Sequence, residues 1–292
     1  MQIHKDPGGT WEWASALPDA RLSPGVIRYR GYRLALGLPR QRLEVPADAV
    51  TLVINFDGEL RLTDVRDPGT ATTHRFLTCG LRTSATLGEH DGSLYGVEVV
   101  LTPWAAFTLL GVAMQECSET VVDASELLGR RVDELAESLA SRSRWEERFE
   151  LLDITLTRWA AGGPACPPRI VWAWDQLART SGRTRIQDVA EGSGWGRRQF
   201  EYRFRRHIGV PAKSAARIMR LQRALRLLSE GRAPVEAATA SGFFDQAHLT
   251  REVTTMTGRP PTRLLAARRR AAPGPGARDR LDGRITSVLV PR

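Results

Sequence analysis

The chain has 292 residues, enough for two domains of about 120 to 170 residues, each with a core of its own. Its net charge of +9 is unevenly divided, because residues 1–167 carry a net charge of −6 and residues 168–292 a net charge of +15. This asymmetry is typical of a nucleic-acid-binding module joined to a domain with another role. Arginine supplies 40 of the 42 basic residues, but that bias does not explain why the excess lies in one half.

The cysteines and the apolar residues exclude several classes of protein. Cys79, Cys117 and Cys166 are far apart and show no CxxC spacing, so neither a zinc site nor a disulfide framework is indicated. No apolar run approaches the length of a membrane span, and the N-terminus lacks a signal-peptide pattern. We therefore expect a cytoplasmic, nucleoid-associated protein with no metal, no cofactor and no membrane contact.

The first part of the chain has the pattern of β-strands. Short segments rich in Val, Ile, Leu and Tyr at 26–36, 50–56, 76–81 and 95–101 are separated by Gly, Pro and Asp. Strands at this spacing predict a compact β-barrel or sandwich.

Helical patterns begin at Thr102-Pro103, which form a good N-cap and first helical residue. Helices are predicted at 104–112, 124–128, 132–139 and 145–159. In the last of these, Phe149, Leu152, Leu156 and Trp159 form one apolar stripe, which favours packing within the domain over a coiled-coil dimer seam.

Gly162-Gly163-Pro164 and the prolines that follow are the clearest linker. We expect an α+β protein: a β-rich, barrel-like N-terminal sensor domain with trailing helices, and an all-α C-terminal domain. The expected boundaries are 1–161 for the regulatory domain, 162–168 for the linker, 169–270 for the helical domain and 271–292 for a flexible tail. Within this tail, residues 285–290 have the composition of a short strand.

The basic half contains a degenerate internal repeat. Ser193-Gly194-Trp195 matches Ser241-Gly242-Phe243, which lies 48 residues later. Phe200, Phe204 and Gly209 match Leu249, Val253 and Gly258, which lie 49 residues later, so the second copy has one extra residue in its turn. Each copy has a short helix, a glycine turn with an aromatic plug, and a second helix with an apolar stripe opposite a polar face. These are the parts of a helix-turn-helix unit.

The segment 211–231 between the copies predicts one connecting helix, because its apolar residues recur at helical spacing with arginines interleaved. A plain arginine-rich helical bundle is the simpler interpretation. The turn chemistry makes two helix-turn-helix units the favoured one, with each second helix suited to the major groove.

These residues resemble the AraC/XylS family of bacterial transcription regulators over about 168–268. Three segments carry the resemblance: Gly242-Phe243-Phe244-Asp245-Gln246-Ala247-His248, Arg220-Leu221-Gln222-Arg223-Ala224, and Gly258 with Pro260-Pro261. It implies two helix-turn-helix units in successive major grooves of double-stranded DNA, about 34 Å apart.

The resemblance also implies the residues that contact DNA. Base contacts are expected from Arg198, Glu201, Tyr202, Gln246, Ala247 and Arg251. Phosphate contacts are expected from Arg197, Arg203, Arg205, Arg206 and Lys213. Gly196 replaces a Ser cap, which weakens the first recognition helix slightly. Lost bulk and charge around the second unit predict that it binds less tightly than the first. His248 is expected to pack or to contact the backbone.

For the acidic half, the resemblance implies a sensor of a small-molecule effector, and RNA polymerase and a second copy of the chain are further candidate partners. An enzyme is disfavoured. Glu89, His90 and Asp91 are adjacent, so on a strand they cannot converge on one site, and no phosphate loop or nucleophile elbow is present. The main prediction is a sequence-specific transcription regulator. The alternatives are a nucleoid-associated protein of low specificity and, less favoured for lack of clustered cysteines, a DNA-modifying enzyme with an AraC-like module.

Overall fold

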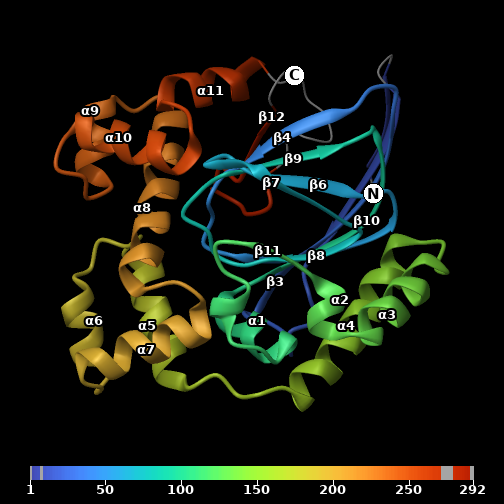
Figure 1. Ribbon diagram of the computed structural model, residues 1–292, viewed down its shortest axis with the longest axis horizontal. Helices are drawn as coiled ribbons and strands as arrows, with labels where there is room; N and C mark the ends of the chain where they lie inside the picture. Colours follow the sequence, from blue (N-terminus) through green and yellow to red (C-terminus); the bar gives the residue numbers. More distant parts are fainter. Residues whose placement is uncertain (1, 7–8, 271–278, 290–292) are drawn as a thin grey trace.

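The N-terminal part of the protein is built from two antiparallel β-sheets that face each other (Figure 1). The computed structural model describes residues 2–6, 9–270 and 279–289. The larger sheet has the order β1 (Gln2–Asp6), β2 (Gly9–Ala16), β3 (Val26–Leu36), β10 (Ser93–Leu101), β5 (Val50–Asp57), β8 (Phe76–Cys79), β11 (Val121–Asp123). The smaller sheet has the order β12 (Ser287–Leu289), β4 (Arg40–Glu44), β9 (Thr86–His90), β6 (Leu60–Asp64), β7 (Asp67–His74). We call the two sheets together the barrel. The sequence predicted a compact β-barrel or sandwich for this part of the chain, and the two sheets confirm it.

The larger sheet is covered on both faces, which explains why β5 and β10 are nearly continuous apolar runs. On one face Tyr29 stacks on Phe149 of the helical layer, with ring centroids 5.9 Å apart. A Cβ at Gly31 would lie 2.3 Å from the ring of Trp145, so only glycine allows this close approach. The opposite face, with Trp13 and Tyr32, looks into the space between the sheets.

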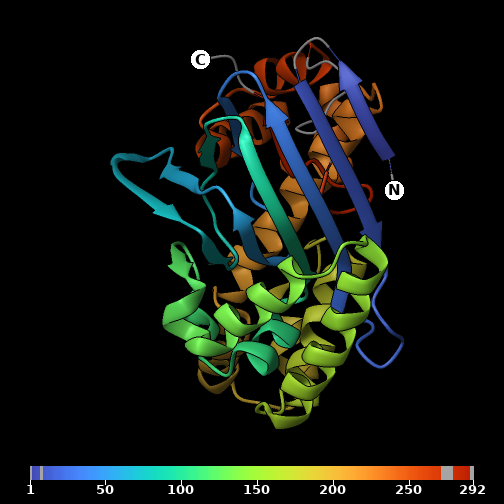
Figure 2. The ribbon, with the colours of Figure 1, turned by 90° about the vertical axis from the view of Figure 1, so that its right-hand side faces the viewer.

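Four helices pack on this outer face (Figure 2): α1 (Pro103–Leu110), α2 (Ala124–Leu128), α3 (Arg130–Ala140) and α4 (Trp145–Gly162). A short 3₁₀ turn, η1 (Met114–Glu116), follows α1. The Thr102 side chain caps α1 by accepting a hydrogen bond from the Ala105 N–H at 3.3 Å. Phe149, Leu152, Leu156 and Trp159 of α4 are all buried, which confirms the prediction that they are core residues.

The C-terminal part is helical (Figure 1). Its helices are α5 (Pro168–Arg179), α6 (Ile186–Gly192), α7 (Arg197–Ile208), α8 (Ala212–Ser229), α9 (Pro234–Ala240), α10 (Gln246–Thr257) and α11 (Pro261–Arg270). Helix α8 runs between the group α5–α7 and the group α9–α11. With 18 residues, it is about 27 Å long.

The expectation of a flexible tail over 271–292 is wrong for residues 279–289, which lie against the barrel, whereas the short strand expected within 285–290 is present as β12. Strand β12 pairs antiparallel with β4, with Val288 opposite Leu43. The pairing satisfies those backbone polar groups of β12 and β4 that face each other, and Ile285 and Val288 are buried. The remaining tail residues, 271–278 and 290–292, lie outside the described part of the chain.

Candidate nucleic-acid interface and barrel cavity

The first predicted helix-turn-helix unit consists of α6 and α7. Ser193 ends α6, and its hydroxyl donates a hydrogen bond to the Ala190 carbonyl at 2.6 Å and accepts one from the Trp195 N–H at 3.3 Å. Gly194 has a φ of 69°, a conformation that favours glycine, and it turns the chain into α7. The sequence predicted this glycine turn, and the structure confirms it.

Helix α7 presents a buried and an exposed face. Phe200, Phe204 and Ile208 are fully buried, whereas Arg198 and Tyr202 are exposed and Glu201 is half-buried. Glu201 and Tyr202 lie three and four positions after Arg198, so all three residues are on one side of the helix. Gly196 is the N-cap residue of α7 but cannot cap it with a side-chain hydrogen bond, because glycine has no side chain.

The residues predicted to contact phosphates differ in how accessible they are. Arg197, Arg205, Arg206 and Lys213 are exposed. Arg203 is half-buried, and its guanidinium lies 5.1 Å from the centroid of the Trp195 ring. Arg169 of α5 lies over the same ring at 5.4 Å. Arg203 therefore also stabilises the turn through a cation–π contact.

The second unit consists of α9 and α10, and its turn is one residue longer than the first. Gly242 has a φ of 78°, and the Asp245 carboxylate caps α10 by accepting a hydrogen bond from the His248 N–H at 2.6 Å. The His248 ring accepts a hydrogen bond from the Phe244 N–H at 3.4 Å and packs edge-on against Phe243. The predicted packing role of His248 is confirmed.

The predicted base contacts of the second unit stand at the start of α10. Gln246, Ala247 and Arg251 are exposed, and Ala247 and Arg251 share a face because they are four residues apart. Phe244, in the turn before them, is 91% exposed. The structure thus leaves all three side chains accessible to a large partner.

The interleaved arginines of α8 hold the second unit in place, a role that their sequence pattern alone did not reveal. Arg217 makes two hydrogen bonds to the Glu252 carboxylate of α10, at 3.0 and 3.2 Å. Arg223 donates to the carbonyl of Ala240 in α9 at 2.9 Å, and Arg220 lies over the Phe243 ring. The sequence did indicate that these arginines share one helix face, because they are spaced three residues apart.

Both units also contact the N-terminal part at the C-terminal ends of α7 and α10. The His207 ring lies 4.4 Å from that of Phe107 in α1. Burial lowers the pKa of His207, against the opposing effect of its hydrogen bond with the Arg203 carbonyl. In the second unit the Ala85 N–H donates to the Met256 carbonyl at 2.7 Å.

Comparisons with known proteins agree with this geometry. Residues 189–267 match a family model described as a Helix-turn-helix domain. The C-terminal domain is an AraC-type helix-turn-helix domain. An uncharacterized HTH-type transcriptional regulator of Bacillus subtilis (strain 168), YbfI, is 31% identical over 64 residues, which is 22% of this chain and 23% of that protein. The chain thus matches less than a quarter of this relative's length.

Solved structures of ToxT from Vibrio cholerae strain SCE256 are also similar. An apo variant is 12% identical, with a TM-score of 0.42, and the likeness covers 89% of this chain and 98% of that one. The unsaturated fatty acid-bound wild type is 12% identical, also with a TM-score of 0.42, over 78% of this chain and 93% of that one.

Beside the AraC-type domain, the molecule has a cavity of about 1070 Å³ inside the barrel. On the side of the larger sheet its walls are mostly apolar, with Trp13, Tyr32 and Leu94 facing inward. Arg259, just before α11, and Arg263, in its first turn, also line the cavity. The cavity therefore lies between the sheets and next to the AraC-type domain.

The charged side chains of the cavity form a network that sequence analysis did not predict. The Arg30 guanidinium donates to the Glu98 carboxylate at 2.6 Å, and both side chains are almost completely buried. Burial alone would raise the pKa of Glu98, but the neighbouring guanidiniums of Arg280 and Arg30 outweigh it and lower the pKa. The sequence contained one signal of this network: Glu98 is a charged residue between two valines of a strand with a buried, apolar pattern.

His90, at the end of β9, also lines the cavity. Burial, assisted by the positive charge of Arg42, lowers its pKa to about 4, so the ring is neutral at pH 7. Within the described ranges, no cluster of His, Cys, Asp and Glu could hold a metal ion. None of the helices described is long and apolar enough to cross a membrane.

Proposed function

We propose that this protein is a sequence-specific transcriptional regulator that acts on chromosomal DNA in the cytoplasm. The observation that carries the proposal is the pair of helix-turn-helix units on one chain, each with an exposed polar face on its second helix. Residues 169–270 would bind DNA and residues 1–161 would regulate that binding. RNA polymerase and a second copy of the chain are the proteins that such a regulator would meet at a promoter.

The two recognition helices would enter successive major grooves. Arg198, Glu201 and Tyr202 of α7 and Gln246, Ala247 and Arg251 of α10 would then contact bases. The exposed residues Arg197, Arg205, Arg206 and Lys213, together with the half-buried Arg203, would contact phosphates. Because five arginines lie on α7 and one on α10, the first unit would supply most of the affinity.

Competition binding tests the proposal. At about 150 mM salt, the full-length protein should prefer the DNA upstream of a regulated gene over bulk DNA by at least about 10³. Equal affinity for all fragments would favour the alternative, a nucleoid-associated protein of low specificity.

A single substitution tests the assignment of the second recognition helix. Arg251→Ala should reduce discrimination at one half-site by about 1–3 kcal/mol. Arg21→Ala removes the same charge from an exposed position on the N-terminal domain and is the matched control. If Arg251→Ala weakened binding to every sequence equally, the side chain would be a phosphate contact instead.

We further propose that the barrel cavity binds a small-molecule effector with an apolar body and a hydrogen-bond acceptor. Apolar walls would hold the body. Among the described residues, the Thr86 hydroxyl and the Arg82 Nε–H are buried without a partner, and both residues line the cavity. Two donors at the wall would suit an acceptor group on the ligand.

Thermal-shift screening of amphipathic metabolites tests this second proposal. A true effector should stabilise the wild type but not Leu94→Trp, in which the larger ring occupies the cavity. Thr86→Val, which has almost the same volume, should bind it more weakly. A compound that stabilises all three proteins equally binds elsewhere.

A further inference from the structure

The C-terminal segment 279–289 is attached to the barrel at its rim. Strand β12 extends the smaller sheet beside β4, and the Val45 N–H donates to the Thr286 carbonyl at 2.9 Å. Arg284 forms two hydrogen bonds, both 2.9 Å, with the Asp48 carboxylate in the loop that follows β4. This placement makes Arg280, earlier in the segment, part of the cavity lining.

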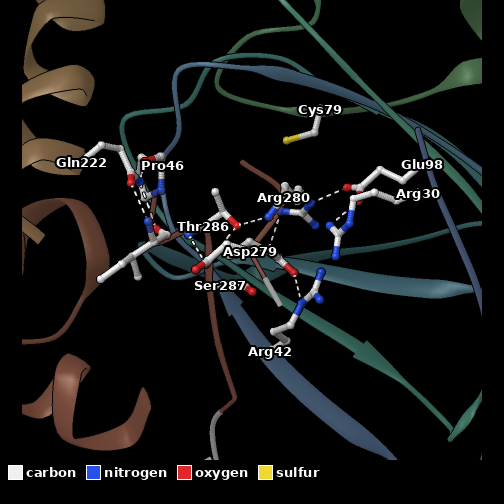
Figure 3. A network of polar contacts seen from close by, with 12 residues as sticks. Arg30, Arg42, Pro46, Cys79, Glu98, Gln222, Asp279, Arg280, Thr286 and Ser287 are labelled. Atoms are coloured by element: carbon white, nitrogen blue, oxygen red, sulfur yellow. Dashed lines mark hydrogen bonds and ion pairs between the residues drawn. The ribbon is translucent and has the colours of Figure 1, made fainter. Parts of the chain in front are cut away.

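Arg280 lines the cavity, and Figure 3 shows its guanidinium facing the Glu98 carboxylate. Its guanidinium forms an ion pair with Glu98 and another with Glu44, the latter 2.5 Å long. Only 19% of its side chain is exposed. Burial lowers the pKa of Arg280, but the two carboxylates outweigh that effect and raise it, so this side chain stays charged.

Both carboxylates keep a second partner that does not belong to the segment. Glu98 also accepts from Arg30, at 2.6 Å, and Glu44 also accepts from Arg42, at 2.5 Å. If Arg280 left the cavity, neither carboxylate would be a buried charge without a counter-ion. The site is therefore able to exist with Arg280 in it or with Arg280 out of it, because departure leaves two neutral pairs.

The same segment is fastened to the AraC-type domain. The side chain of Gln222, buried in the middle of α8, donates to the carbonyls of Ile285 at 3.0 Å and of Pro46 at 2.6 Å, and accepts from the Ile285 N–H at 2.9 Å. Arg268 of α11 donates to the Asp279 carboxylate at 3.0 Å. In Figure 3, Thr286 of this segment lies between Gln222 and Arg280.

We propose that residues 279–289 are a built-in ligand of the barrel: Arg280 fills a guanidinium site formed by Glu44 and Glu98 and thereby fastens α8 and α11 to the barrel. Release of Arg280 loosens the segment and so changes how the AraC-type domain is held. Compounds that carry a guanidinium group belong to the class of ligand that this site accepts in place of Arg280.

Hydrogen exchange on the full-length protein tests the attachment. In Arg280→Ala the backbone amides of residues 285–289 should exchange at least about tenfold faster, because the segment opens more often. Ethylguanidinium, which matches the lost end of the side chain, should bind to this variant and stabilise it, while ethylammonium at equal concentration should do so less. Unchanged exchange, or an equal response of the wild type to ethylguanidinium, would overturn the proposal.

Two further variants separate this attachment from general destabilisation. Glu44→Gln removes one partner of Arg280 and should also speed exchange at 285–289. Arg21→Ala, whose ion pair with Asp19 lies on the surface, should leave that exchange at the wild-type rate. Faster exchange in all three variants would show a global effect and contradict the proposal.

A DNA-binding measurement tests the coupling, which rests on the function proposed above. Arg280→Ala should change the affinity for a specific site by at least about fivefold relative to Arg21→Ala, which carries the same net charge. Equal affinities would overturn the coupling. If the wild type bound no specific DNA, the proposed function would fail, while the exchange result would still stand by itself.

Discussion

Gly209 is the residue at which the C-terminal end of α7 meets the N-terminal domain. Its φ is 105°, and a Cβ there would lie 1.9 Å from the Ser118 hydroxyl oxygen and 2.9 Å from the Met114 carbonyl oxygen. The Ser118 hydroxyl donates to that same carbonyl at 2.8 Å. Gly209→Ala therefore strains the backbone and displaces a hydrogen bond at the contact between the two domains.

The expected loss of stability has two parts. Holding an alanine at a positive φ costs about 1–2 kcal/mol, and losing the hydrogen bond costs about 1 kcal/mol. Together they predict that Gly209→Ala lowers the free energy of unfolding by about 2–3 kcal/mol. Gly194→Ala is the matched control. Its φ is also positive, at 69°, but the nearest atom to a Cβ is 3.5 Å away, so only the backbone part applies.

Urea unfolding of the full-length protein measures both changes, and a double-mutant cycle isolates the steric part. Ser118→Ala removes the oxygen that the new Cβ would meet, so in the Gly209→Ala background it should be less destabilising than in the wild type, by about 1 kcal/mol. If the effects of the two substitutions are simply additive, the two residues do not meet. If Gly209→Ala is no more destabilising than Gly194→Ala, residue 209 does not pack tightly against Ser118 and Met114.

Three other predictions follow from single contacts. Burial lowers the pKa of His90 from an unfolded value of about 6.5 to about 4, so the unfolded state takes up the proton first and stability falls as the pH drops. His90→Gln should remove about 2 kcal/mol of the stability change between pH 7 and pH 5, and an unchanged pH profile would contradict the burial. Gly31→Ala should cost about 1–3 kcal/mol in urea unfolding, because its Cβ overlaps the Trp145 ring; full stability would mean that α4 can shift freely. Arg217→Met should cost no more than about 1 kcal/mol, since its pair with Glu252 is partly exposed, but should weaken binding to the half-site of α10; equal weakening at both half-sites would show no local effect.

The helix-turn-helix units were predictable because their signals are local. Gly194 and Gly242 occupy turns that require a positive φ, and the apolar residues that follow recur at the helical period. These constraints act within about 25 residues of chain, so they can be recognised from the local sequence. The two-sheet barrel was predicted as a class, while strand order and register were not, because pairing joins segments such as β3 and β10 that lie about 60 residues apart.

The cavity and its charged network had no such local signal. Arg30, Glu98 and Arg280 are separated by 68 and 182 residues, and nothing in the chain between them indicates that they meet. From their composition, the last residues were predicted to form a flexible tail with a short strand within 285–290, because Pro and Gly dominate the start of this segment. Only the tertiary structure provides the open edge of β4, the buried carboxylate of Glu98 and the half-buried carboxylate of Glu44, which together hold residues 279–289.

The two helix-turn-helix units could be predicted from the sequence, because backbone conformation and helical periodicity are properties of neighbouring residues. The tertiary structure decided how those units are held, because ion pairs and strand pairing depend on which distant groups share a low-dielectric space. The arginines of α8 illustrate the difference. Their spacing in the sequence predicts that they share one helix face, whereas their partners in α9 and α10 could be identified only from the packing of these helices.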